Sequence, residues 1–140
     1  KVKFHHFVLK APIISKIIRK VAVARFTRTF SALIGAGVSV LEALEVTARA
    51  VGNTVYQDSL LDAAKRIKNG EVLSRIINER EDLYPPIVGQ MLAVGEETGQ
   101  TDKVLVKVAD FYEEEVDIAV ATLSSLMEPI IMVVLGRCSD

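Results

Sequence analysis

Apolar residues recur at intervals of three and four along almost the whole chain, whereas alternating apolar and polar runs, which are typical of strands, are almost absent. This spacing collects apolar side chains on one face of a helix. The pattern is interrupted by glycines, by an Asn-Gly pair and by a Pro-Pro pair, which end helices or begin new ones. The chain is therefore predicted to be all-α, a compact bundle of about six antiparallel helices with short links.

The clearest helix start combines Ser39 and Glu42, which form a capping box, with Val38 and Ala43 placed as its hydrophobic staple. The interruptions predict six helices. The first follows Pro12 and ends at Gly35–Gly37, the second runs from Ser39 to Gly52–Asn53, and the third from about Val55 to Asn69–Gly70. A short fourth lies around Val72–Ile77, the fifth runs from Pro86 to Gly99, and the sixth from Thr101 or Asp102 to at least Met127.

The sixth predicted helix separates apolar residues from acidic ones. Its apolar stripe comprises Leu105, Val108, Tyr112, Val116, Ala119, Leu123, Leu126 and Ile130. Asp110, Glu113, Glu114 and Asp117 fall on the opposite side and are expected to point to solvent. Lys107 adds little compensating charge, and like charges at this spacing repel. The acidic face is therefore either a plain solvated surface or a surface that meets a basic partner.

Glu115 lies at the border of the apolar stripe, where an unpaired carboxylate is unfavourable. Arg25 occupies a similar border on the first predicted helix, and Arg28 follows one turn later. We predict that Arg25 or Arg28 forms a partly buried ion pair with Glu115 and holds the two long helices in register.

The segment GEETG, residues 95–99, joins the last two predicted helices. It has neither the lysine of a nucleotide-binding loop nor the ligand ladder of an EF-hand. We expect a turn in which Gly95 permits close approach of another helix and Gly99 ends the fifth helix. Glu96 and Glu97 leave two alternatives open, an adventitious divalent-cation site and, together with Glu113, a small acid–base hydrolase.

The composition of the chain limits the kinds of ligand and reaction that can be predicted for it. Seventeen basic and eighteen acidic residues give a net charge of −1, which provides no general attraction to nucleic acid. The histidines are His5 and His6 and the single cysteine is Cys138, so the usual nucleophile–base and zinc-binding sets are not predicted. We predict no cofactor, no metal site and no enzymatic activity.

The two ends of the chain are predicted to lie outside the folded domain. No apolar stretch of signal-peptide type opens the sequence, and residues 1–12 are predicted to be a loosely held linker. Residues 13–127 form the predicted domain. In residues 128–140, the apolar run Pro129–Gly136 is either the beginning of a membrane span or a buried final turn, since a complete span needs about 20 such residues.

Several segments together resemble the type II secretion system F domain, from Leu9 to Gly136. The most specific combination is AVGEETG, followed by FYEEEVD and then by EPI. Thr101 stands where this family commonly has leucine, and FHHF replaces more usual charged residues near the start.

The resemblance implies a six-helix bundle without catalytic activity on the cytoplasmic side of an inner-membrane platform protein, where it is similar to the second of two copies. It also favours a membrane span that begins at Pro129. The implied partners are a second copy of the chain, an assembly ATPase, other inner-membrane assembly proteins, and pilin or pseudopilin. The acidic face and the glycine-flanked turn are expected to meet these partners, and the interface residues predicted from them are Glu96, Glu97, Glu113, Glu114 and Asp117. The alternative is a soluble helical adaptor unrelated to membranes.

Overall fold

Six helices make up the secondary structure of the computed structural model, which describes the backbone of residues 2–139 and the side chains of residues 15–122. They are α1 (Val2–Gly35), α2 (Val40–Val51), α3 (Thr54–Lys68), α4 (Leu73–Asn78), α5 (Pro86–Thr98) and α6 (Thr101–Ser139). Within the described backbone there is no strand. The predicted all-α fold class is confirmed.

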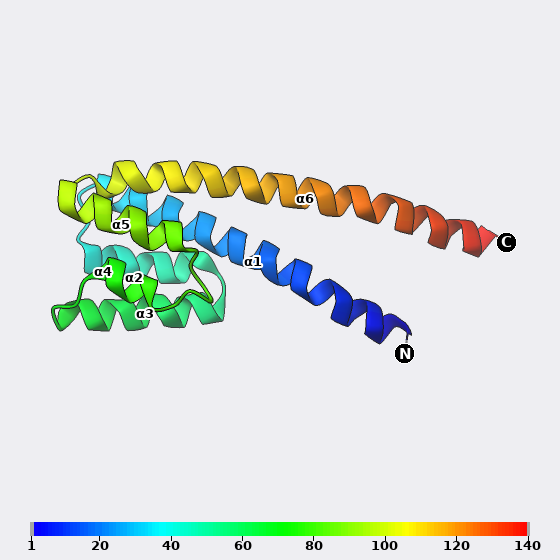
Figure 1. Cartoon of the computed structure of the whole chain (residues 1–140), viewed down its shortest axis with the longest axis horizontal. Coiled ribbons are helices and arrows are strands. Elements are labelled where there is room, and N and C mark those ends of the chain that lie inside the picture. Colours follow the sequence, from blue (N-terminus) through cyan, green and yellow to red (C-terminus); the bar gives the residue numbers. More distant parts are fainter. Residues whose placement is uncertain (1, 140) are drawn as a thin grey trace.

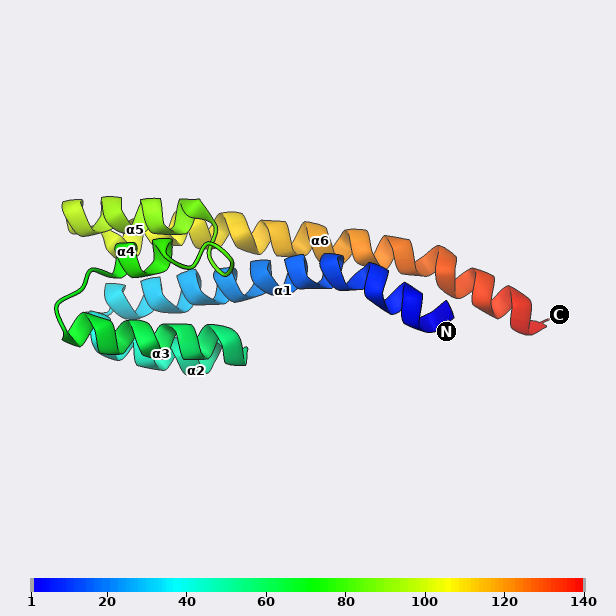
Figure 2. The same ribbon diagram turned by 60° about the horizontal axis from the view of Figure 1, so that its bottom comes forward.

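The two longest helices, α1 and α6, run antiparallel and extend well beyond the other four, as Figures 1 and 2 show. The shorter helices gather at one end of this pair: α2 packs on α1, α3 on α2, α5 on α6, and α4 on α5. The beginning of α1 and the end of α6 therefore project from the same end of the bundle.

The core lies between α1, α6 and the shorter helices and contains an aromatic cluster. The Phe26 and Phe30 rings stack with centroids 5.6 Å apart, and Phe26 lies 5.7 Å from Tyr84 in the α4–α5 link. Tyr56 of α3 meets Tyr84 edge to face at 5.5 Å. Its hydroxyl donates a 2.7 Å hydrogen bond to the Leu83 carbonyl, so that this buried polar group is satisfied. The cluster joins α1, α3 and the α4–α5 link.

Most helix boundaries lie where local signals predict them. Ser39 caps α2, and its hydroxyl accepts a hydrogen bond from the Glu42 backbone N–H at 3.3 Å. Sequence reasoning missed the cap of α3. The Asn53 side chain accepts from the backbone N–H groups of Val55 and Tyr56, at 2.9 and 3.4 Å. Asparagine is among the preferred capping residues, so this signal was present in the sequence.

The predicted start of the first helix is wrong. In the structure α1 begins at Val2 and continues through Pro12. Proline removes one backbone donor and favours the first turn of a helix, which made Pro12 look like a start. The preceding residues, KVKFHHFVLKA, contain no glycine, asparagine, aspartate or serine that would end a helix or cap a new one. The side chains of residues 1–12 lie outside the described range, so their assignment as a linker stays a prediction.

The apolar run Pro129–Gly136 lies in α6, and its side chains are likewise outside the described range, as are those of Leu123, Leu126 and Ile130. Among the residues that the structure describes, none of the helices has a stretch both long enough and apolar enough to span a bilayer.

Candidate functional site

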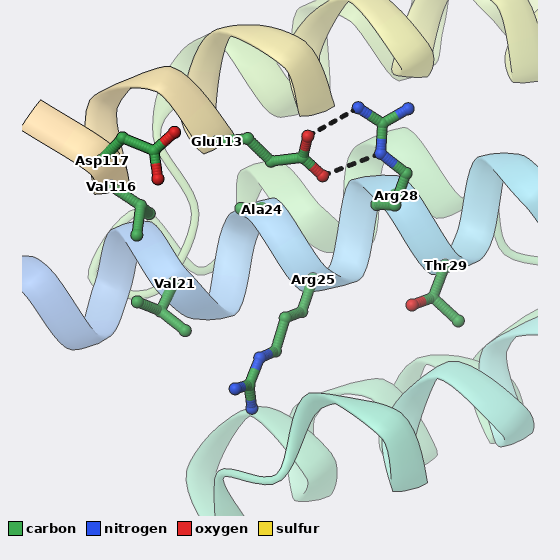
Figure 3. Close-up of a pocket in the computed structure, with 8 residues that line it drawn as sticks. All are labelled: Val21, Ala24, Arg25, Arg28, Thr29, Glu113, Val116 and Asp117. Atoms are coloured by element: carbon green, nitrogen blue, oxygen red, sulfur yellow. Dashed lines mark hydrogen bonds and ion pairs between the residues drawn. The ribbon is translucent and has the colours of Figure 1, made fainter.

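An open cleft of about 390 Å³ lies between α1 and α6. Its lining residues are Val21, Ala24, Arg25, Arg28, Thr29, Glu113, Val116 and Asp117 (Figure 3). Val21, Ala24 and Val116 supply the apolar part of the lining, and the charged side chains stand around it. Such a mixture of apolar floor and charged rim is common at contact surfaces between proteins.

Arg28 connects the two long helices through a forked ion pair. Its Nε and Nη2 atoms each lie 2.8 Å from an oxygen of Glu113, and Nη2 also contacts Asp110. The hydrogen bonds that Arg28 donates lower the pKa of Glu113, and the same bonds, accepted by Glu113 and Asp110, raise the pKa of Arg28. Because the Glu113 side chain is 46% exposed, solvent screens the pair and its contribution to stability is modest.

The acidic face of α6 is only partly as predicted. Glu114 and Asp117 are exposed to solvent, in agreement with the helical pattern. Glu113 is half-buried and turned toward α1, and Asp110 is exposed but also contacts Arg28. Charge compensation therefore comes from a helix about 80 residues earlier in the chain and not from lysines on α6.

The predicted pairing of Glu115 with Arg25 or Arg28 is wrong. Glu115 does connect α6 to α1, but through Lys20, whose Nζ lies 3.5 Å from Oε1 of Glu115. Arg25 instead donates a 3.2 Å hydrogen bond to the Val51 carbonyl at the end of α2. At about 100° per residue, Lys20 and Arg25 point roughly 140° apart around α1, so they face different neighbouring helices.

Glu96 has a structural role that the sequence did not reveal. Its carboxylate accepts hydrogen bonds from the Ser74 hydroxyl at 2.7 Å and from the Ser74 backbone N–H at 3.1 Å. Ser74 lies in the first turn of α4, where Val72 provides no side-chain cap. A carboxylate at this position satisfies an orphan backbone donor and interacts favourably with the helix dipole. Glu97 remains exposed.

The two glycines of GEETG act as predicted. Gly95 is buried, and a Cβ atom added to it would lie 2.6 Å from Cα of Thr101. Gly99 has a φ angle of 70° and ends α5 in the left-handed conformation that glycine favours. The segment is thus a tight turn that brings α5 directly against α6.

The acid–base hydrolase requires at least two of Glu96, Glu97 and Glu113 in one hollow. The α1–α6 cleft contains Glu113 but neither of the other two. A carboxyl that acts as a general acid needs a raised pKa, whereas Arg28 lowers the pKa of Glu113. Among the described residues, no group of three potential metal ligands comes together. The α1–α6 cleft therefore does not bring together the pair of carboxylates that the hydrolase requires.

Comparison with known proteins gives consistent matches. Residues 26–138 match the family model described as type II secretion system (T2SS), protein F. The type IV pilus assembly protein PilC of Thermus thermophilus is 43% identical over 128 residues, covering 91% of this chain and 32% of the relative. The PilC protein of Pseudomonas aeruginosa is 43% identical over 129 residues, covering 92% of the chain and 34% of the relative.

A type II secretion system protein F of Pseudomonas aeruginosa is 28% identical over 134 residues, which cover 96% of the chain and 33% of that protein. The chain spans about a third of the length of the curated relatives it matches. The family model covers most of the chain, from the last third of α1 almost to the end of α6. This chain therefore belongs to the family of type II secretion system protein F.

Proposed function

We propose that the chain is a non-catalytic scaffold domain of an inner-membrane platform protein and lies on the cytoplasmic side. In this role it supports assembly of type IV pili or of type II secretion pseudopili. It does so by self-association and by docking to the assembly ATPase and to partner membrane proteins. The observation that carries the proposal is the family match over residues 26–138. The names of the relatives refer to type IV pilus assembly and to type II secretion.

The architecture suits a scaffold. The α1–α6 pair projects from one end of the bundle, which leaves the opposite end and the sides of the bundle for other proteins (Figure 1). The pairs Arg28–Glu113 and Lys20–Glu115 connect the two long helices at two levels. Such connections hold helices in register more than they stabilise them. The pair therefore acts as a stiff support between a membrane attachment and the bundle.

The acidic residues available to a partner are fewer than the sequence suggested. Glu96 and Glu113 are engaged within the chain, at Ser74 and Arg28. Glu97, Glu114 and Asp117 are exposed. Exposed carboxylates that repel one another are favourable toward a basic surface, and such rim charges act mainly on association rate and specificity. We assign Glu97 and Glu114 to the surface that meets the assembly ATPase.

Charge reversal in the full-length protein tests this assignment. Glu97→Lys and Glu114→Lys together are expected to weaken capture of the ATPase and to reduce pilus assembly or secretion in cells. Stability should change by no more than about 0.5 kcal/mol, because both side chains are exposed. The matched control is Asp58→Lys with Asp62→Lys, two exposed acids on α3. Unchanged capture and unchanged assembly in the first variant would contradict the proposed docking surface.

Self-association is tested separately by light scattering of this chain over a concentration series. The apparent mass is expected to rise with concentration. A monomeric mass throughout would contradict self-association of the domain. Docking to the ATPase would not be affected by that result, because the charge-reversal experiment tests it independently.

A further inference from the structure

Positive charge is concentrated in the first of the two long helices. Residues 1–41 contain no aspartate or glutamate, whereas residues 42–140 contain all eighteen acidic residues of the chain. The basic residues of the first part are Lys1, Lys3, Lys10, Lys16, Arg19, Lys20, Arg25 and Arg28. Helix α1 lies within this part, so it has no acidic residue of its own to compensate the charge. The compensation has to come from another helix or from a binding partner.

The cations in the second half of α1 have partners inside the bundle. Arg28 and Lys20 form ion pairs with acids of α6. Arg19 and Arg25 donate hydrogen bonds to backbone carbonyl groups of the α4–α5 link and of α2, at 2.6 and 3.2 Å. Lys16 is exposed and forms no ion pair with any residue from 15 to 122, the part whose side chains the structure describes. Within that part, the uncompensated charge of α1 therefore begins at Lys16.

The first half of α1 projects beyond the four short helices and contains two more lysines. Because α1 and α6 are antiparallel, this part of α1 lies at the same end of the molecule as the last part of α6 (Figures 1 and 2). Lys3 and Lys10 belong to it. In α6, residues 118–136 contain a single charged residue, Glu128. The two projecting segments together therefore have a net positive charge.

The same end of the molecule has an apolar run. Pro129–Gly136 lies in the last part of α6 and contains no charged residue. Basic residues next to an apolar segment are typical of the boundary between a membrane and water, where lysines lie at the headgroups and apolar residues lie deeper. The fold brings these two features together at one end, although they come from the first and the last of its helices.

We propose that the projecting end of α1, through Lys3, Lys10 and Lys16, binds the anionic headgroups of phospholipids at the membrane surface. The inference rests on the proposed membrane attachment and names the lipid chemistry of that attachment. The ligand is a headgroup with a net negative charge, as in phosphatidylglycerol. Ammonium groups attract such headgroups through charge and require no shaped pocket. This attraction adds to the insertion of an apolar segment, and two such signals together attach a protein more firmly than either alone.

Nucleic acid offers the same phosphate chemistry, but the distribution of charge favours lipid. A nucleic-acid duplex is a long polyanion and needs basic residues along an extended surface. In this chain the uncompensated basic residues lie at one end, and the remainder of the bundle, from residue 42 onward, is predominantly acidic. A duplex lying along the bundle would be repelled, whereas a flat lipid surface meets the projecting end alone.

The expected strength depends on how many of the lysines lie close to the surface. One lysine near an anionic membrane strengthens binding by about fivefold, and the effect falls off within a Debye length of about 10 Å at 0.1 M salt. Lys3 and Lys16 are roughly 20 Å apart along the helix. The three lysines therefore do not all contribute fully. We expect the loss of all three charges to weaken binding by at least about tenfold, and by less than the roughly hundredfold of three full contributions.

Co-sedimentation of this chain with lipid vesicles tests the proposal. The vesicles consist of phosphatidylcholine alone, or of phosphatidylcholine with about one third phosphatidylglycerol, so that they differ in negative charge. The wild-type chain should bind the charged vesicles at least about tenfold more tightly than the neutral ones. Raising the salt from about 0.1 M to about 1 M shortens the Debye length to about 3 Å and should remove most of this difference.

Substitutions at the three lysines locate the binding surface. Lys3→Gln, Lys10→Gln and Lys16→Gln together should weaken binding to the charged vesicles by at least about tenfold. Lys3→Arg, Lys10→Arg and Lys16→Arg together keep the charge and should keep the binding. Circular dichroism of both variants reports whether the helices are retained.

The matched control removes the same number of positive charges elsewhere. It combines Lys65→Gln, Lys103→Gln and Lys107→Gln, at three exposed lysines of α3 and α6. The end of α3 and the start of α6 lie at the end of the bundle away from the projecting helices (Figure 1). This control should therefore bind the charged vesicles as the wild type does.

Several results would overturn the proposal. Equal binding to neutral and charged vesicles would mean that the apolar run alone accounts for attachment. Equal binding by the wild type and the glutamine variant, or equal losses in that variant and in the control, would exclude the projecting end of α1 as the lipid surface. Release from the vesicles by duplex DNA at equal phosphate concentration would indicate a general site for polyanions.

The proposal stays testable if the glutamine variant loses helicity. In that case the salt dependence of the wild-type chain decides, because binding to charged vesicles that persists at about 1 M salt would overturn an electrostatic contact. A chain that binds neither kind of vesicle would overturn lipid binding by this domain. The scaffold role would be unaffected by that result, because ATPase capture and pilus assembly test it independently.

Discussion

Replacing Gly95 by alanine tests how closely α5 and α6 approach. Gly95 is an interior residue of α5, where alanine would ordinarily favour the helix by about 1 kcal/mol. In this structure the added Cβ atom would lie 2.6 Å from Cα of Thr101 and 3.1 Å from its backbone nitrogen. Carbon atoms in contact are about 3.5–4.0 Å apart. The two helices would therefore have to separate by roughly 1 Å, since a backbone atom cannot rotate away.

Overpacking destabilises proteins by about 1–3 kcal/mol. Because the clash is with backbone atoms of Thr101, we expect a cost of about 2–3 kcal/mol, which exceeds the gain in helix propensity. We expect Gly95→Ala to lower the free energy of unfolding by about 1–2 kcal/mol and the melting temperature by roughly 3–10 °C. The measurement is thermal and urea unfolding followed by circular dichroism. Gly35→Ala is the control, because its new Cβ would lie 3.4 Å from a side-chain oxygen of Asp102, which is an ordinary contact. A Gly95→Ala chain as stable as the wild type, or more stable, would refute the close approach of the helices.

Two further predictions concern polar groups. Thr47 is fully buried and its hydroxyl has no hydrogen-bond partner among the described residues, so Thr47→Val should leave stability equal or increase it by up to about 1 kcal/mol. Thr27 is buried too, but its hydroxyl donates to the Val23 carbonyl at 2.8 Å, and Thr27→Val should lower stability by about 0.5–1.5 kcal/mol. The urea unfolding midpoints of the two variants measure these effects. Equal losses of stability at both sites would contradict a hydrogen bond at Thr27 and the lack of one at Thr47. Glu113→Gln should lower stability at pH 7 by no more than about 1 kcal/mol, because the ion pair with Arg28 is half-exposed. Arg28 lowers the pKa of Glu113 in the folded chain, so this contribution is present above the ordinary carboxyl pKa and disappears as the pH falls through the folded-state pKa. Unfolding measured from pH 7 to pH 2 should show the difference between Glu113→Gln and the wild type vanish in acid. A Glu113→Gln deficit that persists at pH 2 would contradict the ion-pair origin.

The number, type and limits of most helices were predictable because their signals are local. Ser39 at the start of α2, Pro86 at the start of α5 and Gly99 at its end act through their own backbone or that of residues within one turn. The buried positions of Leu105, Val108 and Tyr112 on α6 followed from helical periodicity for the same reason. Where the local signal was ambiguous, as at Pro12, the predicted boundary was wrong.

The partners of the charged side chains were not predictable from local signals. Glu113 meets Arg28, Glu115 meets Lys20, and Glu96 caps α4 through Ser74, each across at least 22 residues of chain. Each contact depends on which helices are neighbours and on how each is rotated about its axis, where one residue changes the direction of a side chain by about 100°. Periodicity defines which face of a helix is apolar, but the packing of the whole bundle defines which charge stands opposite another. For that reason local sequence signals determined the helices of this chain. Its charged contacts and the cleft between α1 and α6 depended on how those helices pack together.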